Sequence, residues 1–237
     1  MNIGNVRILP NAVPTPIYSI TPFTLLDYPG KTACILWFAG CNMHCTYCYN
    51  PDIVLGKGRM SIEKALEFLR SRKGLLQGVV LSGGECTLHP TIFPLLEAAK
   101  AFGFEVKIDT NGSRPQVLEA LIAQGLIDYV ALDFKALEQR YHAITKSGLF
   151  PQFTASLSLL NRSNVPFEVR TTVHSDLITT ADLQQMVHFL QQHDYRGSYY
   201  IQHYVNGVPV LGELGRSVKH ARLSELSVDG IEVVERG

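Results

Sequence analysis

The sequence lacks several features that would assign it quickly to a class of protein. It has no apolar run close to the ~18 residues that a membrane-spanning helix requires. Residues 1–20 have no apolar core followed by small residues, as a secretory signal would. The 21 Lys and Arg residues balance 21 Asp and Glu residues, which indicates neither a basic nucleic-acid-binding surface nor an acidic tail. We therefore expect a cytoplasmic protein with no membrane and no nucleic-acid partner.

What the sequence does contain is a regular alternation of short apolar segments and helical patterns. Each apolar segment has the length of a buried strand, and the residues after it repeat apolar side chains at helical spacing, as at Ile62, Ala65 and Leu69. Strands that alternate with helices pair in parallel through right-handed crossovers. The expected strands are 32–38, 78–82, 105–110, 128–134, 167–173 and 198–204.

These six units are fewer than the eight that close a full barrel, so we expect an α/β fold that is a partial (β/α)6 barrel of parallel strands. No linker divides the 237-residue chain, which predicts a single domain over residues 1–237. Its core would span about residues 20–204, between an N-terminal extension, 1–19, and a C-terminal tail, 205–237.

Unusual polar residues follow several of the expected strands, at the carboxyl ends where ligands collect in parallel α/β folds. The sequences SGGE (82–85), DTNG (109–112) and DFK (133–135) each end one strand. Arg170 lies within the fifth strand and His203 near the end of the sixth. Because these ends share one edge of the sheet, we expect the residues to form a single site.

Three of the five cysteines, Cys41, Cys45 and Cys48, lie within a short stretch directly after the first strand. An odd number of cysteines, clustered in this way, indicates a metal or cluster site in a reducing compartment rather than a disulfide framework. A structural zinc site needs four ligands, and His44 beside Cys45 is poorly placed to complete one. A cubane iron–sulfur cluster held by three thiolates would leave one iron open to another ligand.

Two other classes of protein stay open on the cysteines alone. One is a simple iron–sulfur electron carrier, which a fourth ligating cysteine would favour, and the other is a zinc-binding interaction module. The repeated polar residues at the strand ends argue against both, because neither class needs a cofactor cavity there.

The spacing C-x3-C-x2-C, with Tyr47 immediately before the third cysteine, resembles the signature of the radical S-adenosylmethionine enzymes. The resemblance covers about residues 20–204. It implies one 4Fe-4S cluster bound by Cys41, Cys45 and Cys48, with S-adenosyl-L-methionine on the open iron. In that family the reduced cluster cleaves the sulfonium, which gives methionine and a 5′-deoxyadenosyl radical.

The resemblance also implies roles at the other strand ends. Gly83 and Gly84 would let the backbone approach the methionine amino group, and Glu85 would add a carboxylate. Lys135 and Arg170 would supply positive charge toward the cofactor carboxylate or ribose. On the residues alone, the glycine segment also fits a tight turn at a helix start. The other implied cofactor contacts are Tyr47, Asp109, Thr110, Asn111, Asp133 and His203, the last of which also fits a satisfied core histidine.

Asp109 and Asp133 follow neighbouring strands and would repel each other in a partly dry site unless a cation lay near them. In pyruvate formate-lyase activating enzymes, a similar DTNG and D-x-K pair supports a monovalent cation. The resemblance implies such an ion here, held by the two carboxylates and the carbonyls of Thr110 and Ala131. The alternative is that the two residues only cap helices and bind the ribose.

The segments TLLDYPGK (24–31) and CYNPD (48–52) resemble the anaerobic ribonucleoside-triphosphate reductase activating proteins, a group of glycyl-radical enzyme activases. Tyr49 departs from the histidine that is usual there. The resemblance implies that a glycine of the partner enzyme loses a hydrogen atom, and that flavodoxin or ferredoxin donates the electron. The alternative within the superfamily is an enzyme that acts on a small molecule, similar to 7-carboxy-7-deazaguanine synthase.

Overall fold

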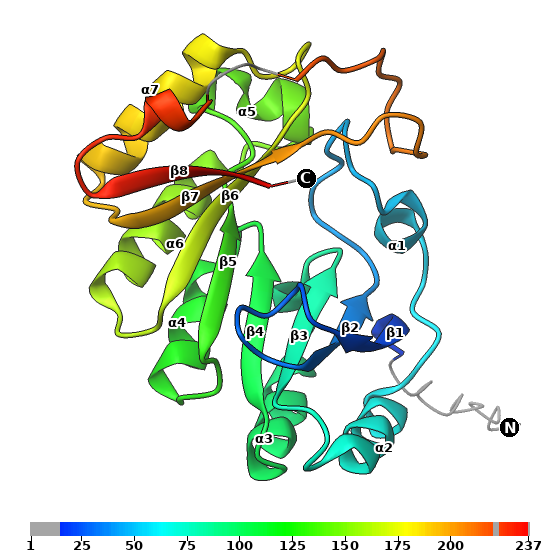
Figure 1. Ribbon diagram of the computed structural model, residues 1–237. Helices are drawn as coiled ribbons and strands as arrows, with labels where there is room; N and C mark the ends of the chain where they lie inside the picture. The colour runs from blue at the N-terminus through cyan, green and yellow to red at the C-terminus, as the bar shows by residue number, and fades with distance from the viewer. Residues whose placement is uncertain (1–14, 220–222, 237) are drawn as a thin grey trace, which may run out of the picture.

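The computed structural model describes residues 15–219 and 223–236, and one eight-stranded sheet forms its centre (Figure 1). All strands but the first run parallel, and the first is antiparallel to the second. The expected α/β fold with a parallel sheet is therefore confirmed. In chain order, which is also the order in the sheet, the strands are β1 (Ile17–Thr24), β2 (Ala33–Phe38), β3 (Gly78–Gly83), β4 (Glu105–Thr110), β5 (Tyr129–Asp133), β6 (Phe167–Val173), β7 (Gly197–His203) and β8 (Ile231–Arg236).

The strands β2 to β7 are the ones expected from apolar runs, and β1 and β8 are additions at the two edges. β1 begins inside the expected N-terminal extension, and β8 lies in the expected tail. Neither has a continuous apolar run, because an edge strand buries only part of its side chains: Ile17 and Thr24 in β1, Ile231 and Val233 in β8. Residues 1–14 of the expected extension lie outside the described residues.

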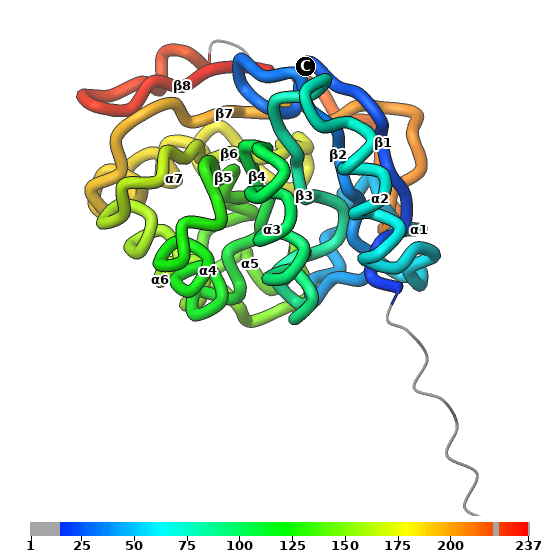
Figure 2. The backbone as a smooth tube through the Cα atoms, turned by 90° about the horizontal axis from the view of Figure 1, so that it is seen from below, coloured from blue at the N-terminus to red at the C-terminus, as the bar shows by residue number. Residues whose placement is uncertain are grey.

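Helices follow the parallel strands and cover the outer side of the sheet. The α-helices are α1 (Pro51–Leu55), α2 (Ile62–Arg72), α3 (Ile92–Ala101), α4 (Pro115–Ala123), α5 (Glu138–Thr145), α6 (Phe150–Arg162) and α7 (Thr180–Gln192), with the 3-10 helices η1 (Cys86–Leu88) and η2 (Leu223–Leu226). Seen from below, the strands form an open arc with α3, α4, α6 and α7 outside it (Figure 2). In the parts of the chain that the structure describes, no helix is long and apolar enough to cross a membrane.

Local sequence signals explain where the helices begin. The Ser61 hydroxyl accepts the backbone N–H of Lys64 at the start of α2. At the start of α7, Thr179 and Asp182 form a capping box, in which each side chain binds the backbone of the other. Both helices then bury an apolar stripe, which in α2 consists of Ile62, Ala65 and Leu69.

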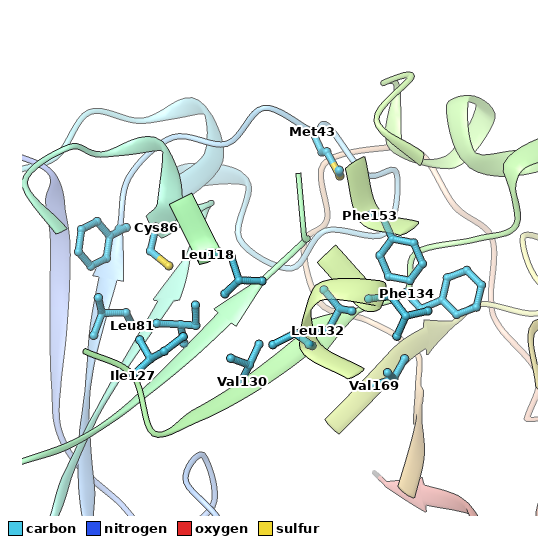
Figure 3. Close-up of a cluster of buried hydrophobic side chains, with 14 of the residues drawn as sticks. Met43, Leu81, Cys86, Leu118, Ile127, Val130, Leu132, Phe134, Phe153 and Val169 are labelled. Carbon is cyan, nitrogen blue, oxygen red and sulfur yellow. The ribbon is translucent and has the colours of Figure 1, made fainter. Parts of the chain in front are cut away.

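The main core lies between the outer side of the sheet and the helices (Figure 3). Val130, Leu132 and Phe134 point from β5 and its end into this layer and are completely buried. Phe134 stacks on Phe153 of α6 with ring centroids 4.8 Å apart. This packing fixes the strands, and so it fixes the direction in which the alternate, inward-facing side chains point.

The inner side of the arc is apolar only toward the amino ends of the strands. Tyr28, Ala33, Ile35 and Val80 form a second buried cluster there, with Trp37 and Tyr129 packed against it. The sheet register then places polar residues above this cluster at the carboxyl ends, where Asp109 pairs with Ala131, and Asp133 with Arg170. The inner side therefore has a closed lower end and a polar upper end.

Candidate functional site

A cavity lies at the carboxyl ends of the parallel strands, beside the loop that carries the three clustered cysteines. Apolar Met43 and Val54 and polar Ser82, Thr172 and Gln202 contribute to its wall. The expected site residues that line it are Cys41, Cys45, Tyr47, Cys48, Gly83, Gly84, Asp109, Asn111, Asp133, Lys135 and Arg170. The other three expected residues, Glu85, Thr110 and His203, are not part of the lining.

The cysteine loop after β2 is held by backbone hydrogen bonds that aim its thiols at the cavity. The N–H groups of His44 and Thr46 donate to the carbonyls of Thr145 and Ile144 at the end of α5, at 2.9 and 3.0 Å. Cys41, Cys45 and Cys48 are free thiols. Burial raises the pKa of Cys41 to about 12 and that of Cys45 to about 11, so binding of a metal group would release protons from both.

The donor set fits an iron–sulfur cluster better than a single metal ion. Among the described residues, no three His, Cys, Asp or Glu side chains converge closely enough to bind one ion. The side chain of His44 is exposed and is not part of the cavity lining, although its neighbour Cys45 is buried there. In a cubane cluster each thiolate binds a different iron, so the sulfur atoms need not meet at one point.

Gly83 and Gly84 bring the end of β3 directly against the cysteine loop. A Cβ atom on Gly84 would lie 1.8 Å from the carbonyl oxygen of Gly40, and one on Gly83 would lie 2.7 Å from that of Phe38. Gly83 also has a φ of +111°, a value that side chains disfavour. The two glycines therefore let the end of β3 pack against the backbone of the cysteine loop, and both form part of the cavity wall.

Glu85 lies behind this wall and connects the strand ends to one another. Its buried carboxylate accepts the backbone N–H of Asn111 at 2.8 Å and the hydroxyls of Thr110 and Thr87 at 2.9 and 2.5 Å. Burial raises the pKa of Glu85, while these hydrogen bonds oppose the rise. With its donors supplied by the protein, the carboxylate fixes the DTNG segment.

The DTNG segment in turn binds the cysteine loop through side-chain amides. Asn111 donates to Asn42 at 3.0 Å, Asn42 donates to Ser113 at 2.8 Å, and the Ser113 N–H donates back to Asn111 at 2.9 Å. The Asn111 amide also lies 3.7 Å from the sulfur of Cys41. This ring of contacts keeps the first cysteine in place next to β4.

Two carboxylates, Asp109 and Asp133, form the floor of the cavity with Lys135 and Arg170. The buried Lys107 lies beneath this floor and pairs with Asp109. Asp109 accepts from Lys107 at 2.5 Å, from Ser82 at 2.9 Å and lies 3.2 Å from an Arg170 nitrogen. Burial alone would raise the pKa of Asp109, but the charges of Arg170 and Lys107 outweigh it and lower the pKa to about 2. Asp109 is therefore ionised at neutral pH.

Asp133 is paired in the same manner. Its carboxylate accepts from Arg170 at 2.5 Å and from Lys135 at 2.9 Å. Burial opposes its ionisation, yet the two cations lower the pKa of Asp133 below its ordinary value. Arg170 thus joins the carboxylates of two neighbouring strands with a single guanidinium group.

Tyr47 supplies a buried polar group that has no partner. Its side chain is 3% exposed, its hydroxyl makes no hydrogen bond to any described residue, and it lines the cavity. An unsatisfied buried hydroxyl costs roughly 1–3 kcal/mol, so such groups usually mark a bound ligand or water. Together with the glycine wall and the three thiols, it fits a polar cofactor beside a cluster.

His203 is oriented away from the cavity by its place in β7. Its ring nitrogen lies 2.7 Å from the Glu235 carboxylate of β8, on the side opposite to its neighbour Gln202, which lines the cavity. Sequence reasoning missed Gln202, Thr172 and Lys107. The sequence did contain a signal for them, because side chains two residues apart on a strand face the same side. Thr172 and Lys107 are each two residues from a predicted site residue, Arg170 and Asp109.

Comparisons with known proteins agree with this site. Residues 35–191 match the family model of the Radical SAM superfamily. A protein of Methanocaldococcus jannaschii, described as a candidate glycyl-radical enzyme activating enzyme, is 33% identical over 180 residues, which are 72% of this chain and 73% of that protein. The pyruvate formate-lyase-activating enzyme of Clostridium pasteurianum is 33% identical over 140 residues, which are 56% of this chain and 58% of that enzyme.

Solved structures show the same fold. SuiB of Streptococcus suis, whose crystal structure contains S-adenosylmethionine, superposes with a TM-score of 0.65 at 17% identity. The superposition covers 86% of this chain and 52% of SuiB, so this chain spans about half of that longer protein. The family match includes β2 to β6 and most of α7, with all three clustered cysteines. The chain therefore belongs to the radical S-adenosylmethionine superfamily.

Proposed function

We propose that this protein activates a glycyl-radical enzyme, and that its partner is an anaerobic ribonucleoside-triphosphate reductase. The observation that carries this proposal is that the three clustered thiols and most of the expected cofactor contacts line one cavity. The names of two relatives, each 33% identical over the aligned residues, support the activase role. The segment TLLDYPGK (24–31) supports the narrower choice of partner.

The residues of the cavity divide into those for the cluster and those for the cofactor. Cys41, Cys45 and Cys48 would hold a 4Fe-4S cluster, which leaves one iron free of protein ligands. With one electron from a flavodoxin or ferredoxin, the cluster and S-adenosylmethionine supply a carbon-centred radical that takes hydrogen from a C–H bond. The protein's own contribution is to bind and orient these two groups and to shield them from water.

The chain offers a complementary group for each end of the cofactor. Gly83 and Gly84 line the cavity without side chains, so their backbone carbonyl groups would accept from an amino group. Arg170 and Lys135 attract a carboxylate, since with Lys107 beneath the floor the cationic side chains outnumber the two carboxylates. The free hydroxyl of Tyr47 provides a further polar contact, and Met43 and Val54 help to exclude water.

The open sheet provides a route for a glycine that belongs to another protein. β1 and β8 are the two edges of the eight-stranded sheet, and the arc does not close between them (Figure 2). An extended loop of the partner can enter by this side and bring one glycine Cα to the cavity. The same carbon loses a hydrogen atom and becomes the glycyl radical.

The test is electron paramagnetic resonance on an anaerobic mixture of the reconstituted protein, S-adenosylmethionine, a reductant and the anaerobic ribonucleotide reductase of the same organism. We expect a glycyl-radical doublet that requires the cofactor. The variant Cys45→Ala should give no doublet. Cys34→Ser is the matched control, because Cys34 is a buried thiol in β2 that does not line the cavity.

Two other results would change the proposal in different ways. If 5′-deoxyadenosine forms but no doublet appears, the radical chemistry stands and the partner is wrong. The search would then turn to other glycyl-radical enzymes and to small substrates of the kind that 7-carboxy-7-deazaguanine synthase uses. If no 5′-deoxyadenosine forms from a protein that holds its cluster, the proposed activity itself is wrong.

A further inference from the structure

Every carboxylate oxygen of Asp109 and Asp133 already has at least one partner from the protein. One oxygen of Asp109 accepts from Lys107, and the other lies within 3.2 Å of both Ser82 and Arg170. One oxygen of Asp133 accepts from Arg170 and the other from Lys135. The monovalent ion expected from the resemblance would therefore have to share these oxygens with cationic side chains or displace one of them.

Lys107 is the residue that most distinguishes this arrangement from a site that holds a monovalent cation. It lies on the inner side of β4, two residues before Asp109, and is only 2% exposed. Its neighbours in the sheet register are Val80 and Tyr129, neither of which carries a negative charge at neutral pH. A buried ammonium group needs an anionic partner, and the structure gives it Asp109 at 2.5 Å.

The negative charges of the floor are more than neutralised without any added ion. Two carboxylates, Asp109 and Asp133, face three cationic groups, Lys107, Arg170 and Lys135. The surplus positive charge is available to the cofactor carboxylate. A monovalent cation would raise this surplus and would be repelled by Lys107 and Arg170. The residues present therefore do not fit a cation.

We propose that Lys107 takes the place of the monovalent cation in this chain, as a positioning residue that holds Asp109 ionised and in line with Asp133. Binding of S-adenosylmethionine is then independent of Na⁺ and K⁺. Removal of the ammonium group opens one oxygen of Asp109 and converts the site into one that takes up an alkali-metal ion. This inference concerns the cofactor end of the cavity and holds whichever protein carries the target glycine.

The test compares S-adenosylmethionine binding in NaCl, KCl and choline chloride at equal ionic strength, by anaerobic calorimetry on the reconstituted full-length protein. We expect the wild-type protein to bind equally tightly in all three salts. Lys107→Met should bind about tenfold more weakly in choline chloride, as losses of supporting residues around a site do. Addition of Na⁺ or K⁺ should restore its binding in a saturable manner.

A second readout does not depend on the cofactor. The thermal unfolding midpoint of reconstituted Lys107→Met should rise with Na⁺ or K⁺ but not with choline, because an ion that binds only the folded protein stabilises it. Lys100→Met is the matched control. Lys100 also pairs with one aspartate, Asp128 at 2.6 Å. Asp128, unlike Asp109, does not line the cavity, so the Lys100 variant should show no such preference.

Two results would overturn the inference. One is a wild-type protein that binds S-adenosylmethionine more tightly in Na⁺ or K⁺ than in choline, which needs no variant and so holds even if Lys107→Met does not fold. The other is a folded Lys107→Met protein that is equally weakened in all three salts, because Lys107 would then support the fold without standing in for an ion.

Discussion

At the scale of the residue, the role of each cysteine depends on where it lies in the fold. Cys34 and Cys86 are completely buried in the core, whereas Cys41, Cys45 and Cys48 line the cavity. The five thiols are chemically alike, so only their positions separate a ligand from a core residue. Substitution of each cysteine tests this assignment.

We expect Cys41→Ala, Cys45→Ala and Cys48→Ala each to abolish cleavage of S-adenosylmethionine, because a cluster with two protein ligands is not held. Cys34→Ser should keep an iron content near that of the wild-type protein. The measurements are iron and sulfide content after reconstitution and 5′-deoxyadenosine by chromatography. Full activity in any of the three alanine variants would contradict the ligand assignment.

The charged floor gives a prediction about acid stability. The pKa of Asp109 is lowered to about 2 in the folded protein, against about 3.9 in an unfolded chain. The ionised carboxylate therefore stabilises the fold above about pH 4, and this contribution is lost as the pH falls toward about 2. Asp109→Asn, which also leaves Lys107 without its partner, should lower the free energy of unfolding by roughly 2–3 kcal/mol near pH 7.

The measurement is urea unfolding of wild-type and Asp109→Asn protein over a pH series. The difference in the free energy of unfolding should be constant from about pH 7 to pH 5. It should shrink below about pH 4, because the ionised Asp109 carboxylate then stabilises the wild-type fold less and less. A difference that grows on acidification would show that Asp109 is not held ionised by its neighbours.

The sequence allowed much of the site to be predicted, because strand ends and the cysteine spacing are local features. The positions of Glu85 and His203 were not predictable in the same way. Glu85 is adjacent to two cavity glycines, but its carboxylate is satisfied by Thr87, Thr110 and the Asn111 backbone. His203 depends on Glu235, a residue of a strand that the sequence did not indicate.

At the scale of the element, apolar runs predicted β2 to β7 to within one residue at each end. Such runs arise because these strands are covered on the outer side by helices and, toward their amino ends, on the inner side as well. β1 and β8 are edges with partly exposed residues, so their patterns resemble loops. Their pairing is set by the whole sheet and not by their own composition.

The segment after β7, which composition left without a role, packs over the cysteine loop. The N–H groups of Leu211 and Gly212 donate to the carbonyls of Cys48 and Thr46 at 3.0 and 2.9 Å. Nearby, the hydroxyl of Tyr49 accepts the N–H of Val205 at 2.7 Å. The residue that departs from the usual histidine is thus part of the contact between these two segments.

Gly212 makes this contact testable. A Cβ atom there would lie 2.4 Å from the Thr46 methyl group and 3.0 Å from its carbonyl oxygen, so Gly212→Ala must push the two segments apart. We expect the cluster to be lost faster in air, and the decay of its visible absorbance measures this loss. Gly215→Ala is the control, because its Cβ would meet only Asp176 at an ordinary 3.6 Å. Equal decay in both variants would show that the segment does not protect the cluster.

At the scale of the whole molecule, the open arc leaves two edges that have different surfaces. β8 carries Arg236, which pairs with Glu168 at 3.1 Å and lies over the ring of Tyr200. The other edge, β1, leads into Leu25 and Leu26, which are 63% and 92% exposed. They follow Thr24, which pairs with Ala33 at the amino end of β2, so they lie at the lower end of this edge. Neighbouring exposed leucines are typical of a surface that another protein covers.

Under the proposed function, Leu25 and Leu26 contact the glycyl-radical enzyme and not the cofactor. The double variant Leu25→Ser/Leu26→Ser should therefore form 5′-deoxyadenosine at the wild-type rate without the partner. With the partner it should give a weaker glycyl-radical doublet, by about tenfold if the two side chains contribute as buried interface residues do.

Leu75→Ser is the control, because Leu75 is 69% exposed but lies in the turn between α2 and β3. Raising the partner concentration should restore the doublet of the double variant, since only docking is weakened. A loss of 5′-deoxyadenosine in parallel with the doublet would mean that the two leucines support the cavity itself.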